Sequence, residues 1–235
     1  LEHYLAALRI VSHQDEFSSW PWPGHGHERV QNGLLSWAAH PDQTAERVKR
    51  ALEAVKRIPA DYSSYERFVM SRWEYDLSNL AGWSLGSEQD WDGAMRLLAL
   101  QWLPWEKARA RRILDYLARG TTAELRRVEA RLKNDEQVEP VAVSPEAERF
   151  CDSTTLRVLN AHTVCWLTQK RIYEEMRRRT LVLQLALAAW RREHGSLPKT
   201  LDELVGEYLD AVPVDPYTGR PFEYYPEGRQ DAGLG

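Results

Sequence analysis

The apolar stretch from Leu181 to Trp190 most constrains what this chain can fold into. Its apolar residues cover more than one face of a helix, so the helix predicted here should be central, with other elements packed around it. The stretch is too short to cross a bilayer, which takes about 20 apolar residues. Gln184 interrupts it, and on a central helix we expect this side chain to be buried and hydrogen-bonded, because an unsatisfied amide would be costly.

Three signals predict a compact unit after this helix. Gly195 should end the helix, because glycine readily takes the left-handed conformation of a C-terminal cap. Apolar residues at helical spacing predict a short helix over residues 201–209, opened by a capping box from Thr200 to Glu203. The sequence Asp215-Pro216-Tyr217-Thr218-Gly219 is typical of a tight turn. Phe222 and Tyr224 should then lie on one side of a short strand, which completes a small β-hairpin.

The rest of the chain has the apolar periodicity of helices, and no convincing period-two alternation occurs before residue 210. A further capping box from Thr121 to Glu124 follows Gly120, which predicts the end of one helix and the start of another. Helices are predicted near residues 1–13, 27–39, 43–58, 63–81, 91–101, 104–119, 122–134, 145–194 and 201–209. The predicted fold is mainly α, a multi-helix bundle or helical-hairpin array with a small C-terminal β-hairpin.

A polar, proline-containing segment from Glu136 to Val143 is the best candidate for a subdomain boundary. We therefore expect a helical region over residues 1–143 and a second region over residues 144–235. The second region holds the long central helix and the C-terminal tail, and the two regions could also form one continuous domain.

Composition narrows the possible partners of the chain. Its 235 residues are 43% hydrophobic and 28% charged, as in an ordinary globular protein. The net charge of −4 comes from both signs mixed throughout, which predicts no nucleic-acid partner. Two cysteines without metal-ligand spacing predict no cofactor. Because the chain begins without Met, we expect any membrane segment to lie outside it.

The segment Trp20-Pro21-Trp22-Pro23-Gly24-His25-Gly26-His27-Glu28 is the most suggestive candidate site. His25, His27 and Glu28 have the side-chain types that bind zinc. The structural alternative is a Trp-anchored loop that leads into a helix. Trp20 and Trp22 could also stack on sugar rings or contact a partner, because indole combines a large apolar area with one hydrogen-bond donor.

Residues 190–225 also resemble a known family. The segments that carry the resemblance are Trp190-Arg191-Arg192-Glu193-His194-Gly195-Ser196-Leu197-Pro198, Leu201-Asp202-Glu203-Leu204, Tyr208-Leu209 and Pro213-Val214-Asp215-Pro216-Tyr217-Thr218-Gly219-Arg220-Pro221-Phe222-Glu223-Tyr224. They look like the C-terminal part of the type II secretion major pseudopilins, in which a helix is followed by a second helix and an "Asp-Pro-Trp-Gly-x-Pro-Tyr-x-Tyr" strand pair.

This resemblance implies a local fold and a possible calcium ion, for which Asp215 is the one matching carboxylate. The chain departs from the family at Tyr217, which stands in place of Trp, and at Thr218, which is inserted before Gly219. About 180 residues also precede the tail. The whole chain is similar to a group of bacterial envelope proteins that carry this tail after a helical region and usually an N-terminal membrane anchor.

These observations lead to three hypotheses about function. The first is a non-enzymatic domain of a membrane-anchored or exported envelope protein on the extracytoplasmic side, which acts as a scaffold or interaction module for a protein partner. The second is a metal-dependent hydrolase that uses His25, His27 and Glu28. The third is a peptide- or glycan-binding helical-repeat module with a Trp-lined groove.

Overall fold

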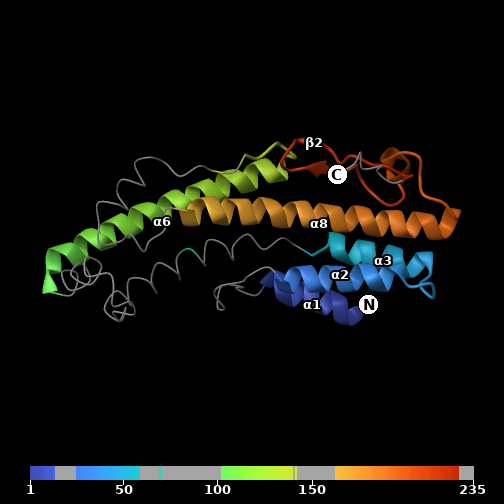
Figure 1. Cartoon of the computed structure of the whole chain (residues 1–235), viewed down its shortest axis with the longest axis horizontal. Coiled ribbons are helices and arrows are strands. Elements are labelled where there is room, and N and C mark those ends of the chain that lie inside the picture. Colours follow the sequence, from blue (N-terminus) through green and yellow to red (C-terminus); the bar gives the residue numbers. More distant parts are fainter. Residues whose placement is uncertain (14–24, 59–68, 70–101, 140, 142–161, 228–235) are drawn as a thin grey trace, which may run out of the picture. The chain divides into compact units, whose positions relative to one another are not determined.

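The computed structural model describes residues 1–13, 25–58, 69, 102–139, 141 and 162–227 (Figure 1). This part of the chain is mainly helical with a small two-stranded antiparallel sheet near the C-terminus, which confirms the predicted fold class. The chain divides into two compact units. Unit 1 comprises Leu1–Asp61, Asp135–Val138 and Tyr173–Gly235, and unit 2 comprises Tyr62–Asn134 and Glu139–Ile172. Each unit therefore takes segments from both sides of residue 143.

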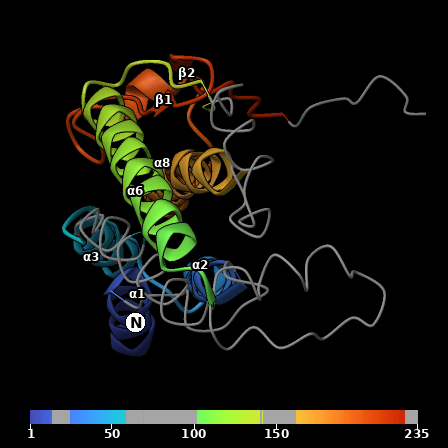
Figure 2. The same cartoon turned by 90° about the vertical axis from the view of Figure 1, so that its left-hand side faces the viewer.

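Unit 1 is built in layers around the second part of one long helix. Its elements are α1 (Glu2–His13), α2 (His25–Ala39), α3 (Ala45–Lys56), the part of α8 (His162–His194) from residue 173 onward, the 3-10 turn η2 (Leu201–Leu204), β1 (Val214–Asp215) and β2 (Arg220–Pro221). Figures 1 and 2 show α1, α2 and α3 on one side of this part of α8 and the β-hairpin on the other. The helix therefore lies between two layers, as its apolar sequence predicts.

The core of unit 1 confirms that central position. The buried residues of the apolar stretch are Leu181, Val182, Leu183, Leu185, Ala186 and Ala189. They share one hydrophobic cluster with buried residues from α1, α2 and α3, among them Leu5, Leu34 and Leu52. Leu204 and Tyr208 join the same cluster from the tail, so the tail is part of this core.

The side chain of Gln184 is exposed, so the prediction that it would be buried is wrong. An α-helix turns by about 100° per residue, which places residues 184, 188 and 191 on one face. Ala188 is only partly buried and Arg191 is exposed on that face. The described residues leave this side of α8 open, and the polar residue in the apolar stretch lies on it.

In unit 2, the two helices predicted on either side of Gly120 are one continuous helix, α6 (Pro104–Lys133). The predicted cap, Thr121, is buried, and its hydroxyl donates to the Leu117 carbonyl at 2.8 Å. A glycine inside a helix costs about 1 kcal/mol relative to alanine. Gly120 is exposed, but the buried face of α6 continues past it, from Leu117 to Leu125 and Val128, and this packing offsets the cost.

The helix predicted over residues 201–209 is only the 3-10 turn η2. Its start is as expected, because the Glu203 carboxylate accepts the backbone N–H of Thr200 at 3.1 Å. Val205 then becomes extended, and Gly206 has a φ of 95°, which a helix cannot accommodate. The apolar spacing nevertheless predicted the packing, since Leu201, Leu204, Tyr208 and Leu209 are all buried.

The predicted hairpin and its turn are confirmed, but β2 ends at Pro221, so Phe222 and Tyr224 follow the strand and do not lie in it. Val214 pairs with Pro221 and Asp215 with Arg220 in the antiparallel register. The Asp215 carboxylate accepts the backbone N–H of Tyr217 at 2.9 Å and the hydroxyl of Thr218 at 3.0 Å. Gly219 has a φ of 66°, and its backbone N–H donates to the Asp215 carbonyl. No described helix is long and apolar enough to cross a membrane.

Candidate functional site: a groove over the end of α8

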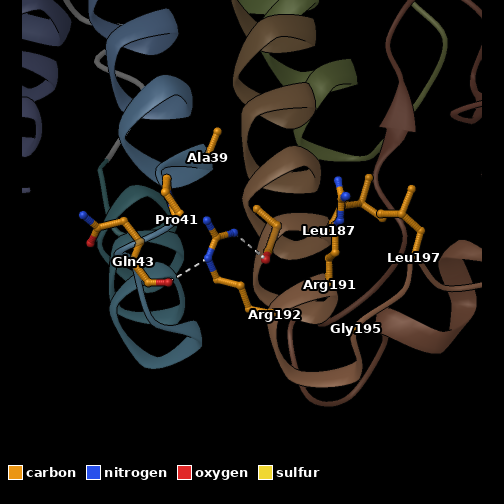
Figure 3. Close-up of a pocket in the computed structure, with 9 residues that line it drawn as sticks. Ala39, Pro41, Gln43, Leu187, Arg191, Arg192, Gly195 and Leu197 are labelled. Atoms are coloured by element: carbon orange, nitrogen blue, oxygen red, sulfur yellow. Dashed lines mark hydrogen bonds between the residues drawn. The ribbon is translucent and has the colours of Figure 1, made fainter.

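The last two turns of α8 form the floor of a groove in unit 1 with a volume of about 530 Å³ (Figure 3). One wall is the connection between α2 and α3, and the other is the segment that follows α8. The lining residues are Ala39, Pro41, Gln43, Leu187, Ala188, Arg191, Arg192, Gly195 and Leu197. This volume is within the usual range of about 300–1,000 Å³ for ligand pockets. The open face of α8, which begins at Gln184, therefore continues into the groove.

Arg192 holds one wall of the groove in place. Its Nε donates to the Gln43 carbonyl at 2.9 Å and its Nη2 to the His40 carbonyl at 3.0 Å. Its Nη1 donates to the carbonyl of Ala188, one turn earlier on its own helix, at 3.1 Å. Figure 3 shows the guanidinium between the helix and the connection. A planar guanidinium suits several acceptors in fixed directions, so Arg192 fixes the shape of the groove.

Arg191 and Leu197 are the two large side chains of the lining that are exposed. Arg191 is exposed, and no ion pair joins it to any residue that the structure describes. Leu197 is 39% exposed although it is a large apolar residue. Ala188 and Leu187 lie between them on the floor and are partly buried. The groove thus combines an apolar floor with one available cation.

A cluster of ionisable groups attaches the tail to α3 and α8 near the groove. The Lys49 ammonium lies 2.8 Å from Glu193 and 2.6 Å from Glu207. The Tyr208 hydroxyl donates to the other oxygen of Glu193, and the Lys49 ammonium lies 4.6 Å from the centre of the Tyr208 ring. Lys49 and Glu193 therefore join α3, α8 and the C-terminal tail.

The electrostatics of this cluster match its geometry. The hydrogen bond from Lys49, followed by the one from Tyr208, holds the pKa of Glu193 below its usual value of 4.5. The hydrogen bonds to Glu193 and Glu207 raise the pKa of Lys49. Burial, reinforced by the hydrogen bond to Glu193, raises the pKa of Tyr208 to about 12. All three groups keep their protonation states at neutral pH, so they hold the fold together and do not exchange protons there.

A second cluster joins the hairpin to α8. The side chain of Arg179 is only 8% exposed, and its Nε lies 2.9 Å from the carboxylate of Glu175, which is buried. Its Nη1 lies 2.8 Å from Asp135 and donates to the Val214 carbonyl at 2.7 Å. Arg179 therefore connects β1, α8 and the segment 135–138 within unit 1.

The structure places the sequence-predicted residues as follows. Glu28 is in the first turn of α2, and its carboxylate lies 3.4 Å from Arg177. His25 and His27 are on the same helix, but their side chains lie outside the described residues, as do Trp20 and Trp22 altogether. Among the described residues, no group of three or more His, Cys, Asp or Glu side chains could hold a metal ion.

Asp215 is described fully, and its two carboxylate oxygens accept hydrogen bonds within its own turn. This contact set defines an Asx turn, which is a conformational role. The calcium ion that the resemblance implies at Asp215 stays a prediction.

Sequence reasoning missed the groove, although its signal was present. Gln184, Ala188, Arg191 and Gly195 recur at helical spacing along the last turns of the predicted central helix and just after it. Polar, small and charged residues on one helical face indicate a surface that the core does not cover. The walls of the groove could be recognised only in the tertiary structure, because Pro41 and Leu197 are more than 150 positions apart in the chain.

No protein-family model matches the chain, and no curated protein or solved structure does so either. The chemistry of the groove is therefore the basis for a functional assignment.

Proposed function

We propose that the chain is a non-enzymatic interaction module whose groove over the end of α8 receives a segment of a protein partner. The observation that carries the proposal is the set of lining residues. The ionisable side chains among them are Arg191 and Arg192, and arginine keeps its proton at any physiological pH. Such a surface supplies shape, apolar contact and positive charge. It supplies no group for proton transfer or nucleophilic attack.

The same residues define the kind of segment that fits. Leu187, Ala188 and Leu197 offer contact to an apolar side chain of the partner. Arg191 can bind a nearby carboxylate through two parallel hydrogen bonds, which fixes orientation as well as adding attraction. We therefore expect a peptide segment that carries a large apolar residue next to an acidic residue or a C-terminal carboxylate.

The proposed setting is the extracytoplasmic side of a bacterial envelope. Its support is the resemblance of residues 190–225 to the major pseudopilins and of the whole chain to helical envelope proteins with the same tail. The first part of that segment contributes to the groove floor and its last part forms the hairpin, so the groove and the hairpin share one stretch of sequence.

Selection of a displayed random-peptide library on the purified chain tests the groove. Enriched peptides should combine an apolar residue with a carboxylate, and Arg191→Glu should weaken their binding about tenfold or more. Arg50→Glu is the matched control, because Arg50 is an exposed arginine on α3 that does not line the groove. Equal losses in the two variants, or selection of no peptide at all, would contradict the proposal.

Metal analysis separates this proposal from a metal-dependent hydrolase that uses His25, His27 and Glu28. We expect the purified chain to hold zinc well below one equivalent. One equivalent of zinc that is lost in His25→Ala/His27→Ala would overturn the assignment as a non-enzymatic module.

A further inference from the structure

One face of α6 in unit 2 carries a row of exposed arginines and aromatic residues. Its members are Trp105, Arg109, Arg112, Tyr116 and Arg119, and we call this surface the arginine face. Trp105 is 64% exposed and Tyr116 is 60% exposed. Their spacing of three and four residues aligns all five positions on one side of the helix over about 21 Å. The row is therefore a continuous surface.

The charge of α6 is opposite in sign to that of the whole chain. The helix holds nine Lys and Arg against four Asp and Glu, a net charge of +5, whereas the chain has a net charge of −4. The rest of the chain is correspondingly more acidic. The signs that look mixed along the sequence are thus separated in the structure, and the exposed face of α6 is positive.

Arg109, Arg112 and Arg119 are exposed, on the side of α6 away from its buried residues. The opposite side of α6 is buried through Leu117, Thr121, Leu125 and Val128. No ion pair joins Arg112 or Arg119 to any residue in the described part of the chain, and the Arg109 guanidinium lies 3.7 Å from Glu106. Asp115 is the exposed acidic residue that flanks the row. Most of the positive charge on this face therefore has no internal counterpart.

We propose that the arginine face binds an acidic segment of a protein partner, most simply a helix with carboxylates at matching spacing. Trp, Tyr and Arg are the residue types that dominate the energetics of protein interfaces. A second helix with Glu or Asp at every third or fourth position would place carboxylates beside the arginines along the whole row. Its apolar residues would then contact Trp105 and Tyr116.

The composition of the surface favours a protein over a lipid bilayer or a nucleic acid. Helices that lie in a bilayer surface present a broad apolar face, whereas the arginine face alternates aromatic residues with arginines and contains no Leu, Ile or Val. A long polyanion would experience the net charge of the whole chain, which is −4. A short acidic helix interacts mainly within the screening length of about 10 Å, where the arginines dominate.

This inference goes beyond the groove, because the arginine face is in unit 2 and the groove is in unit 1. It shares with the proposed function only the idea that the chain binds other proteins. A groove variant such as Arg191→Glu should leave binding at the arginine face unchanged, so the two proposals fail separately.

The test uses the full chain and a fluorescein-labelled synthetic helical peptide with Glu at spacings of three and four residues and interspersed Leu. Fluorescence anisotropy should show binding that weakens as NaCl rises from about 50 mM to about 300 mM. Replacing Glu by Gln in the peptide should abolish it. Arg112→Glu/Arg119→Glu should weaken it about tenfold or more, and a peptide with Lys in place of Glu should bind this variant better than it binds the original chain.

Arg50→Glu/Arg57→Glu, on α3 and at its C-cap, is the matched control, because both arginines are exposed and the change in net charge is the same. Circular dichroism shows whether each variant is folded, and Arg112→Gln/Arg119→Gln replaces the reversed pair if that variant unfolds. Equal losses in the test and control variants, or no binding of the acidic peptide, would overturn the proposal. So would capture of phosphatidylglycerol vesicles or single-stranded DNA by the same arginines in preference to the peptide.

Discussion

The hairpin end of unit 1 and the exposed face of α6 both depend on arginine, and they use it in opposite ways. Arg179 is buried, with Glu175, Asp135 and the Val214 carbonyl as partners. Arg112 is exposed and has no ion pair with any described residue. The comparison shows that burial and partners decide what an arginine does in this chain. The first holds segments together, and the second is available to another molecule.

This difference has a thermodynamic consequence. Removing one partner of a buried ion pair leaves an uncompensated charge in the interior and typically costs about 3–5 kcal/mol. An exposed charge contributes about 0–1 kcal/mol to stability. Changes in the tail should therefore lower the free energy of unfolding, whereas similar changes on the arginine face should leave it nearly unchanged.

The largest effect is expected from truncation of the chain after Gly195. The deletion removes Leu201, Leu204, Tyr208 and Leu209 from the core, and each is worth about 1.5–3 kcal/mol when fully buried. Because a typical domain has a stability of about 5–15 kcal/mol, the truncated chain should unfold or aggregate. Chemical denaturation measures this directly. A midpoint equal to that of the intact chain would show that the tail is a detachable appendage and would contradict its role in holding unit 1 together.

A single substitution in each region sharpens the contrast. Leu204→Ala should lower the free energy of unfolding by about 2–5 kcal/mol, because Leu204 is fully buried in the core of unit 1. Trp105→Ala removes a larger side chain, yet it should change the stability by about 0.5 kcal/mol or less, because Trp105 is exposed. Urea denaturation of both variants measures the two losses in the free energy of unfolding. A greater loss from Trp105→Ala than from Leu204→Ala would contradict our interpretation of the two regions.

An effect smaller than those of the truncation and of Leu204→Ala depends on pH and concerns Glu193, whose side chain is 29% exposed. Because Lys49 holds the pKa of Glu193 below 4.5 in the folded chain, the carboxylate stabilises the fold above that pH and loses this effect as the pH falls through the lowered pKa. Glu193→Gln should therefore cost about 0.5–1 kcal/mol at pH 7 and progressively less below about pH 4.

Denaturation curves at several pH values measure this difference. Asp210→Asn, at an exposed site in the same tail, is the control. A cost of Glu193→Gln that is the same at pH 7 and pH 3 would show that the pair with Lys49 contributes nothing.

Local patterns predicted the elements whose signals do not depend on distant residues. The turn from Asp215 to Gly219 has the expected hydrogen bonds, because its carboxylate, proline and glycine act within a few residues. Phe222 and Tyr224 pack against the core while Glu223 and Tyr225 are exposed, as the period-two alternation predicts. The central position of the Leu181–Trp190 stretch followed from its apolar composition alone.

The predictions that were wrong depended on competition between local and tertiary preferences. Gly120 and Thr121 carry the signals of a helix end and a new cap, but the buried face from Leu117 to Val128 keeps α6 continuous. The apolar neighbours of Gln184 in the sequence predict that it is buried. Whether its face of α8 is covered depends on the positions of α2 and the tail, which the local sequence does not give. The zinc ligands at His25 and His27, the calcium ion at Asp215 and the pseudopilin relationship stay predictions.

The two candidate surfaces were accessible to sequence reasoning only in part. The arginine face could have been found from the spacing of Arg109, Arg112, Tyr116 and Arg119, because a helix aligns such positions. The three consecutive arginines 177–179 are different, because in the structure they contact Glu28, Glu175 and Asp135. The walls of the groove come from distant segments, so only the folded chain brings them together.

The central claim is that the buried Arg179 on α8 holds the fold together, whereas the exposed arginines on α6 are available for binding. Its most direct test compares the urea denaturation of Arg179→Gln with that of Arg112→Gln/Arg119→Gln at pH 7. We predict that the single change at Arg179 lowers the free energy of unfolding by about 3 kcal/mol or more, whereas the double change on α6 alters it by less than about 1 kcal/mol. Equal losses, or a larger loss from the α6 variant, would contradict the claim.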